Sequence, residues 1–379
     1  MYDVAVVGGG LVGSSFALSL IKQNPQLKIV LVEQRKPDFS TNQDGFDNKI
    51  YAISPHNLEM LMTLDIKPNT ERFGTIQSMN VRGDRNSKIE FDSHDCNSRY
   101  LAKIIEYRNL QQSILAELEQ FSQVEFVYGT LNEIWDNDSV ILKGDDFFLQ
   151  AKWLVAADGA NSFVRRKFDF TVEQIPYYQS GVVANFKCEK PNLNVAHQWF
   201  TGDGILAYLP LPNNQISIVW STDRVEELLA LSNEEFAAQV ANESNYELGQ
   251  LEVITRPAAF PLRLNLVNDF VRGHIILIGD AAHTIHPLAG QGVNLGFGDA
   301  WELAKVLAHT NAQPDAATLS RFVALRLAEV RKMQMTCHML HRLFHNRNQI
   351  VNLVRNFGLN LVNNLTLLKK MLIRSAMTY

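Results

Sequence analysis

The sequence predicts an α/β protein with two lobes and a helical C-terminal region. A strand, a glycine-rich turn, a helix and a second strand follow one another between residues 4 and 32, an order that suits a parallel sheet. Short strand patterns dominate residues 177–264, and helical spacing dominates after residue 292. At 379 residues, the chain has room for one large domain and a smaller partner.

The composition is that of a globular protein. Hydrophobic residues make up 46% of the chain and charged residues 20%, enough apolar surface for a core. No apolar run approaches the roughly 18 residues that cross a bilayer. The first residues lack the basic segment of an export signal, and the three cysteines show no paired spacing. We therefore expect a cytoplasmic protein in a reducing compartment, without a metal site.

The positive charge is concentrated at the C-terminal end. Residues 331–379 hold eight Lys and Arg and no Asp or Glu, although the whole chain carries a net charge of -5. Beside an apolar helical stripe, this basic region suits a membrane surface, accessory proteins or a second copy of the chain, and not nucleic acid. A solvated basic helix face is an equal alternative.

The first element pair carries a dinucleotide-binding pattern. Gly8, Gly10 and Gly13 form G-x-G-x-x-G between the strand at residues 4–7 and the helix around residues 16–21. Glu33 ends the strand at residues 29–32, twenty residues after Gly13, where a carboxylate accepts hydrogen bonds from ribose hydroxyls. The backbone amides of the turn and the helix N-terminus suit a pyrophosphate. This pattern alone leaves NAD and FAD both open.

Two later segments, residues 153–165 and 278–296, contain further polar groups at strand ends. Asp280 follows the strand at residues 275–278, where a carboxylate can accept the hydroxyls of a polyol. Gly290, Gln291 and Gly292 precede a helix and offer backbone amides to the anionic edge of a reduced flavin. For His283 we favour ordinary hydrogen-bonded packing.

These segments resemble the Asp-Gly and Gly-Asp signatures of the FAD-dependent aromatic hydroxylases that include para-hydroxybenzoate hydroxylase. Residues 47–54, 104–110 and 368–377 are most similar to the ubiquinone-biosynthesis hydroxylases, so the resemblance covers nearly the whole chain. It implies FAD as the cofactor and Asp280 as the residue that holds the ribityl chain. It also implies further cofactor-site residues, namely Lys49, Arg108, Asp158, Arg165, Pro287 and Asn294.

Lys49 departs from the family pattern, which commonly has arginine at this position. A lysine offers a point charge in place of a planar fork, so the arginine contact of the family is not expected in the same form. Arg108 is expected to reach the pyrophosphate or the ribityl region.

The resemblance implies a monooxygenase reaction in which NAD(P)H reduces FAD and oxygen adds at flavin C4a. The resulting hydroperoxyflavin would hydroxylate a polyprenylated phenol or quinol, an intermediate of ubiquinone biosynthesis. The sequence identifies no catalytic acid or base and no second dinucleotide motif, so the nicotinamide cofactor would bind transiently or another protein would supply electrons. We expect the β-rich lobe to contact the substrate, with five candidate residues, Trp199, Phe200, Tyr208, Leu209 and Trp220.

The expected organisation is a Rossmann-like FAD-binding domain with an inserted β-rich substrate domain. The FAD-binding domain comprises residues 1–75, 99–175 and 265–330, the substrate domain 76–98 and 176–264, and the basic helical region 331–379. Two other functions stay open. The first is a flavin-dependent lipid reductase or dehydrogenase, and the second is a non-catalytic lipid-binding scaffold of a biosynthetic complex.

Overall fold

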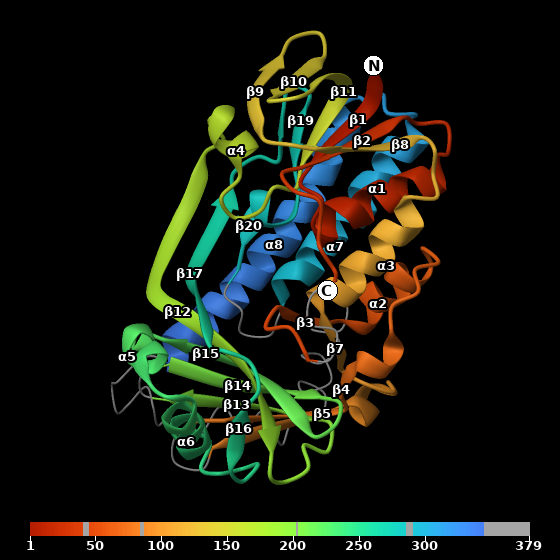
Figure 1. Ribbon diagram of the computed structural model, residues 1–379. Helices are drawn as coiled ribbons and strands as arrows, with labels where there is room; N and C mark the ends of the chain where they lie inside the picture. The colour runs from red at the N-terminus through yellow and green to blue at the C-terminus, as the bar shows by residue number, and fades with distance from the viewer. Residues whose placement is uncertain (41–44, 84–86, 202–203, 286–290, 345–379) are drawn as a thin grey trace.

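The computed structural model describes residues 1–40, 45–83, 87–201, 204–285 and 291–344. Within these residues the chain forms three sheets with helices packed on them (Figure 1). The predicted fold class, an α/β protein with a β-rich second layer and helices toward the C-terminus, is confirmed.

The first sheet contains five parallel strands in the order β19-β11-β1-β2-β8. They are β1 (Tyr2–Val7), β2 (Ile29–Glu33), β8 (Val124–Tyr128), β11 (Phe148–Ala156) and β19 (Ile275–Leu277). Strand β18 (Val271–Arg272) pairs with β19, and β9 (Leu131–Asp136) and β10 (Val140–Gly144) form a hairpin beside β11. Because the parallel strands share a direction, their carboxyl ends lie along one edge.

Helices α1 (Leu11–Gln23), α3 (Tyr107–Leu118) and α7 (Gln291–His309) pack together behind this sheet. Strand β1 is buried from Val4 to Val7, which explains its unbroken apolar run. Helix α1 is buried over most of its length and contacts both α3 and α7. A helix that is covered on several sides needs apolar residues around most of its surface, as α1 has.

The second sheet forms the β-rich layer. Its nine strands are β5 (Ser78–Arg82), β6 (Lys88–Asp92), β12 (Val172–Cys188), β13 (Val195–Thr201), β14 (Gly204–Leu211), β15 (Gln215–Thr222), β16 (Leu251–Val253), β17 (Ala258–Val267) and β20 (His283–Thr284). Helices α5 (Val225–Ala230) and α6 (Asn233–Glu243) cover one face, and β12 and β17 extend from this layer toward the first sheet (Figure 1). Strand β5 pairs with β13, which places part of segment 76–98 in this sheet. The domain boundaries themselves stay a prediction.

A small third sheet connects the two layers. It consists of β3 (Ile50–Ile53), β4 (Gly74–Ile76) and β7 (Ala102–Glu106), with α2 (Pro55–Met62) after β3. Ile76 and Ile104 of this sheet share an apolar cluster with Ala196 and Leu211 of the second sheet. The small sheet therefore joins the cofactor layer to the β-rich layer.

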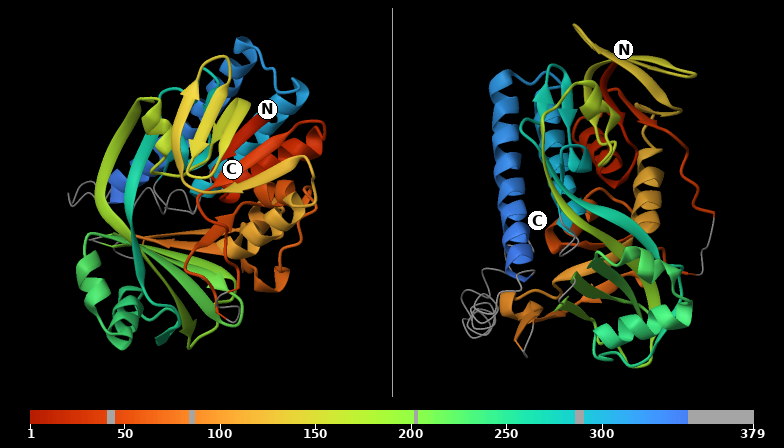
Figure 2. Two further views of the ribbon diagram at one scale, coloured as in Figure 1. Left: turned by 45° about the horizontal axis from the view of Figure 1, so that its top comes forward. Right: turned by 90° about the vertical axis from the view of Figure 1, so that its left-hand side faces the viewer.

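Helix α8 (Ala316–Phe344) runs along both layers (Figure 2). Gln334 Nε2 donates to the backbone oxygens of Asn265 on β17 (3.1 Å) and Thr284 on β20 (3.4 Å). Of the predicted basic region, residues 345–379 lie outside the described residues. Among those described, no helix is long and apolar enough to cross a membrane.

A buried carboxylate, Asp299 on α7, ties three segments together. Its Oδ2 accepts from Gly279 N (2.8 Å) and lies 2.6 Å from His283 Nε2, and its Oδ1 accepts from Arg326 Nε of α8 (2.7 Å). Asp299 is fully buried, and its partners His283 and Arg326 outweigh the effect of burial and lower the pKa of Asp299 to about 2. Because the carboxylate contacts each segment, its charge fixes the turn before Asp280.

We predict that Asp299→Asn lowers the free energy of unfolding by about 3 kcal/mol at neutral pH, because Arg326 loses its buried partner. In the folded protein the pKa of Asp299 lies below the ordinary 3.8, so the ionised carboxylate stabilises the fold above about pH 4. This stabilisation is lost as the pH falls toward 2. Urea unfolding at several pH values measures both effects. Asp138→Asn, at an exposed position, is the matched control, and an equal loss in both variants would contradict the prediction.

Candidate cofactor and substrate site

The glycine turn after β1 packs directly against the end of β11. A Cβ on Gly8 would lie 2.4 Å from the backbone oxygen of Ala157, and Gly8 has a φ of +105°, so only glycine fits there. A Cβ on Gly13 would lie 2.0 Å from the oxygen of Gly8. These two glycines therefore set the contact between the turn, helix α1 and strand β11.

Gly10 differs from these two glycines because a Cβ there would meet nothing within 4 Å. Gly10 is the N-cap of α1, where no side chain caps the helix and the first turn holds no acidic residue. Glu33 Oε2 accepts from Gly9 N (2.6 Å), which places the carboxylate beside the turn. The open space, the amides without a side-chain cap and the adjacent carboxylate suit a pyrophosphate followed by a ribose.

Gln111 of α3 supports the same turn and was missed by the sequence analysis. Its Nε2 donates to the backbone oxygen of Gly9 and to Ser14 Oγ (3.1 Å), while its buried Oε1 has no partner among the described residues. Ser14 Oγ also donates to Gly9 O (2.8 Å). Nothing in the local sequence identifies Gln111, because its partners lie about a hundred residues away.

Lys49 lies near two of the predicted cofactor-site carboxylates, Glu33 and Asp280. Its Nζ is 3.6 Å from the centroid of the Tyr107 ring, within cation–π distance. Burial lowers the pKa of Lys49, while Asp47, Asp280 and Glu33 act in the opposite direction. Glu33 and Asp280 are therefore both close enough to influence one ammonium, so they share a single region of the molecule.

Asp280 lies within that region on the short turn after β19. Its side chain is exposed to solvent, yet burial by the surrounding protein is the largest effect on its pKa and raises it. Exposure combined with close enclosure is expected of a side chain inside a narrow cleft. Lys49 has the same combination. Glu33, Lys49 and Asp280 are therefore neighbours, and we predict that the cofactor cleft runs along them.

Asp158 and Arg165 lie beside the cleft but bond mainly to the protein itself. Asp158 Oδ2 accepts from Phe163 N (2.7 Å) at the start of α4 (Phe163–Lys167), and its buried Oδ1 has no partner among the described residues. Arg165 is buried and donates to the backbone oxygens of Ala160 (2.6 Å) and Ala281 (2.8 Å). Arg165 thus braces the turn of Asp280, and its contact with a cofactor stays a prediction.

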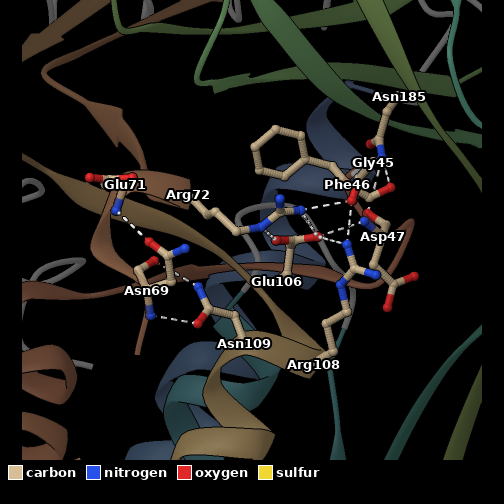
Figure 3. A network of polar contacts seen from close by, with 10 residues as sticks. All are labelled: Gly45, Phe46, Asp47, Asn69, Glu71, Arg72, Glu106, Arg108, Asn109 and Asn185. Atoms are coloured by element: carbon tan, nitrogen blue, oxygen red, sulfur yellow. Dashed lines mark hydrogen bonds and ion pairs between the residues drawn. The ribbon is translucent and has the colours of Figure 1, made fainter. Parts of the chain in front are cut away.

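Arg108 belongs to a polar network with Arg72 and Glu106 (Figure 3). Its guanidinium bonds to the backbone oxygen of Gly45 and to Glu106 Oε1 (3.2 Å), which also bonds to Arg72. Glu106 Oε1 accepts from Asp47 N as well (2.8 Å). Arg108 therefore orders the segment before Lys49, and the predicted contact of Arg108 with a pyrophosphate or ribityl chain stays a prediction.

The start of α7 holds the remaining predicted residues. Asn294 is buried, accepts from Ser54 N (3.0 Å) and donates to Ala52 O (2.8 Å), so its side chain joins α7 to the end of β3. Gly292 faces open space, since a Cβ there would meet only Ile285 at 3.9 Å. Gln291 begins the helix. Pro287 and Gly290 lie outside the described residues.

Three of the five aromatic and apolar candidates for substrate contact lie on the far face of the second sheet. Trp199, Tyr208 and Trp220 belong to the core between this sheet and α5 and α6, and the expectation that they line the substrate is wrong for them. Strand alternation places Phe200 and Leu209 on the opposite face. The sequence shows alternation but not which face meets which layer.

The residues of the cleft fit an extended dinucleotide with a polyol at one end. The open N-terminus of α1, the unpartnered Asp158 Oδ1 and the enclosed Asp280 are the groups that such a molecule would engage. A family model described as "FAD binding domain" matches residues 1–336. The chain belongs to this FAD-binding family. The expected cofactor, FAD, is therefore confirmed at the level of the family.

The relatives include two hydroxylases. The chain is 30% identical to a 3-demethoxyubiquinol 3-hydroxylase of Escherichia coli, with 99% of this chain and 98% of the relative covered. It is 29% identical to the mitochondrial ubiquinone biosynthesis monooxygenase COQ6 of Dictyostelium discoideum, with 98% and 90% covered. The resemblance to the ubiquinone-biosynthesis hydroxylases is confirmed.

Among solved structures, the p-nitrophenol 4-monooxygenase PnpA of Pseudomonas putida has a TM-score of 0.80 at 19% identity. The superposition covers 100% of this chain and 98% of PnpA, and it shows a shared fold.

We predict that Gly10→Ala weakens FAD binding at least tenfold while changing the apoprotein's free energy of unfolding by less than about 1 kcal/mol. The added methyl group meets no protein atom and would occupy the space expected for the cofactor. Fluorescence titration of deflavinated protein and urea unfolding measure the two quantities. Gly8→Ala is the matched variant and should lose stability as well. Unchanged FAD affinity in Gly10→Ala would contradict this assignment.

We also predict a pH dependence of FAD affinity that comes from Asp280. The ionised carboxylate accepts hydroxyl hydrogens, so affinity should fall as the pH drops through the raised pKa, which lies above the ordinary 3.8. The Asp280→Asn variant should bind more weakly at neutral pH and show no such transition. A transition that persists in this variant would assign the pH dependence to another group.

Proposed function

We propose that the protein is an FAD-dependent hydroxylase that inserts one oxygen atom into the ring of a polyprenylated phenol or quinol intermediate of ubiquinone biosynthesis. The observation that carries this proposal is the match over nearly the full length of both chains with a 3-demethoxyubiquinol 3-hydroxylase. The proximity of Glu33, Lys49 and Asp280 supports it, because an extended dinucleotide would pass all three residues.

Bound FAD would supply the redox chemistry with oxygen, and NAD(P)H is the proposed electron donor. The chain itself holds and orients the reactants. Glu33 would hold the adenosine ribose, and the backbone amides at the start of α1 would hold the pyrophosphate. Asp280 would hold the ribityl chain. Lys49 places a positive charge between these groups without the planar geometry of arginine. Arg165 and Asp299 keep the Asp280 turn in place through its backbone.

The β-rich layer is proposed as the substrate side because the cleft adjoins it. The Asn185 side chain on β12 donates to the backbone oxygens of Phe46 (3.1 Å) and Asp47 (3.0 Å), just before Lys49. The segment that carries Lys49 into the cleft therefore rests on the second sheet. A substrate ring on this sheet would lie next to the cofactor, where packed protein on both sides limits access of water.

Contact with a membrane surface or with accessory proteins through residues 331–379, and assembly with a second copy, remain proposals from the charge pattern. A water-insoluble prenyl chain makes a surface of this kind useful. Neither alternative function, a lipid reductase nor a lipid-binding scaffold, is supported by the relatives reported above. Their names describe hydroxylases and monooxygenases.

Turnover in labelled oxygen tests the proposed function. Purified protein with FAD, NADPH, ¹⁸O₂ and a prenylphenol should yield a hydroxylated product with one ¹⁸O atom. The Gly10→Ala variant is the control and should recover activity only at higher FAD concentration. A product without the label would indicate the reductase, and the absence of any product with tightly bound FAD would contradict the proposal.

A further inference from the structure

One face of the second sheet is partly uncovered at its centre, and we call this partly exposed area the hollow. Residues of β12, β13, β14 and β15 alternate between two faces, and Phe186, Tyr208 and Trp220 pack against α6 on one of them. Asn185 points the other way, because its side chain bonds to Phe46 O and Asp47 O of the cofactor layer. The face that shares the side of Asn185 therefore meets the FAD-binding layer.

The middle of this face is a row of small apolar side chains. Val183 lies opposite Val219, and Val219 lies opposite Ala207, so the three cross the sheet side by side. All three are partly exposed although they occupy the inner strands of a nine-stranded sheet. Inner-strand residues in this position are exposed only where the facing layer leaves them uncovered.

The flanks of this row are closed. On one side, Phe200 and Ile205 are buried in a cluster that includes Met333 of α8. On the other side, Asn185 and Ser217 are buried where the sheet meets the segment before Lys49. The hollow is therefore bounded by α8 and by the Lys49 segment, and its floor is apolar and about three strands wide.

Gln198 ends the row of small side chains. It lies opposite Ala207 on β14 and opposite Val81 on β5, and it is 4% exposed. Its amide makes no side-chain hydrogen bond with any residue that the structure describes. Its amide atoms are not among the fully buried unpaired groups of the described residues, so they stay accessible to a ligand. A ligand oxygen that pairs with this amide would therefore add to binding.

We propose that Gln198 determines substrate specificity by hydrogen bonding to an oxygen substituent of an aromatic ring that lies on Val183, Val219 and Ala207. This inference rests on the proposed function and adds the chemistry of the substrate: a flat apolar ring with an oxygen atom at the Gln198 end. A small, flat floor accepts a ring, and a single amide at its end selects the ring's orientation. A buried site that loses its polar partner rejects the deoxygenated analogue.

The test compares two ligands on the FAD-loaded full-length protein, 2-prenylphenol and prenylbenzene, which lacks the ring hydroxyl. Dissociation constants are measured from the change in the flavin absorption spectrum under anaerobic conditions, so no turnover is needed. The wild-type protein should prefer the phenol at least tenfold. In Gln198→Leu this ratio should fall toward one, because an apolar side chain of similar size cannot pair with the hydroxyl.

Two controls separate specificity from structure. Gln174→Leu, at an exposed position on β12, should leave the ratio unchanged. The melting temperature of Gln198→Leu should match that of the wild type, because the substitution removes no side-chain hydrogen bond with the described residues. An equal loss of affinity for both ligands, or a lowered melting temperature, would assign Gln198 a structural role and overturn the inference.

The outcomes also separate this inference from the proposed function. A shifted ratio without ¹⁸O in any product would support the site and contradict the hydroxylase activity. Labelled product with an unchanged ratio would support the activity and overturn the role of Gln198. Absence of any spectral change with both ligands in the wild type would overturn the proposed ligand class.

Discussion

The cofactor cleft depends on one close contact, that between the turn after β1 and the end of β11. The backbone oxygen of Ala157 occupies the position that a Cβ atom of residue 8 would need. The backbone oxygen of Gly8 occupies the position that a Cβ atom of residue 13 would need. Because no larger residue fits at either position, the start of α1 is held against the carboxyl edge of the sheet. Gly10, between these two glycines, faces open space, since a Cβ there would meet nothing within 4 Å.

Charge arrangement connects this edge to the β-rich layer. Asp299 bonds to Gly279, His283 and Arg326, and so fixes the turn of Asp280 relative to α7 and α8. Glu106 orders the segment before Lys49 through Asp47 N. Lys49 then places a positive charge within reach of both Glu33 and Asp280. The buried carboxylate of Asp299 thus positions Asp280, and that of Glu106 positions Lys49. Both act through neighbouring backbone groups.

Local sequence predicted the parts of the site that are built from consecutive residues. The glycine turn, Glu33 and Asp280 follow directly from strand ends in a parallel sheet, and the structure places them along one edge. Contacts between distant segments were not predictable in this way. Gln111 reaches the turn from α3, and Trp199, Tyr208 and Trp220 face α5 and α6 because alternation fixes two faces without saying which layer covers each. Asn294 was expected at the cofactor; its side chain bonds to Ala52 O and Ser54 N, and its contact with a cofactor stays a prediction.

The central claim is that FAD lies extended along one cleft from Glu33 to Asp280. A crystal structure of the FAD complex tests it most directly. The account predicts that the adenosine ribose lies within hydrogen-bonding distance of Glu33, the pyrophosphate at Gly10 and the ribityl chain at Asp280, with the flavin ring facing the hollow above Val219. Density for the cofactor in a different place, or a ribityl chain without contact to Asp280, would contradict it.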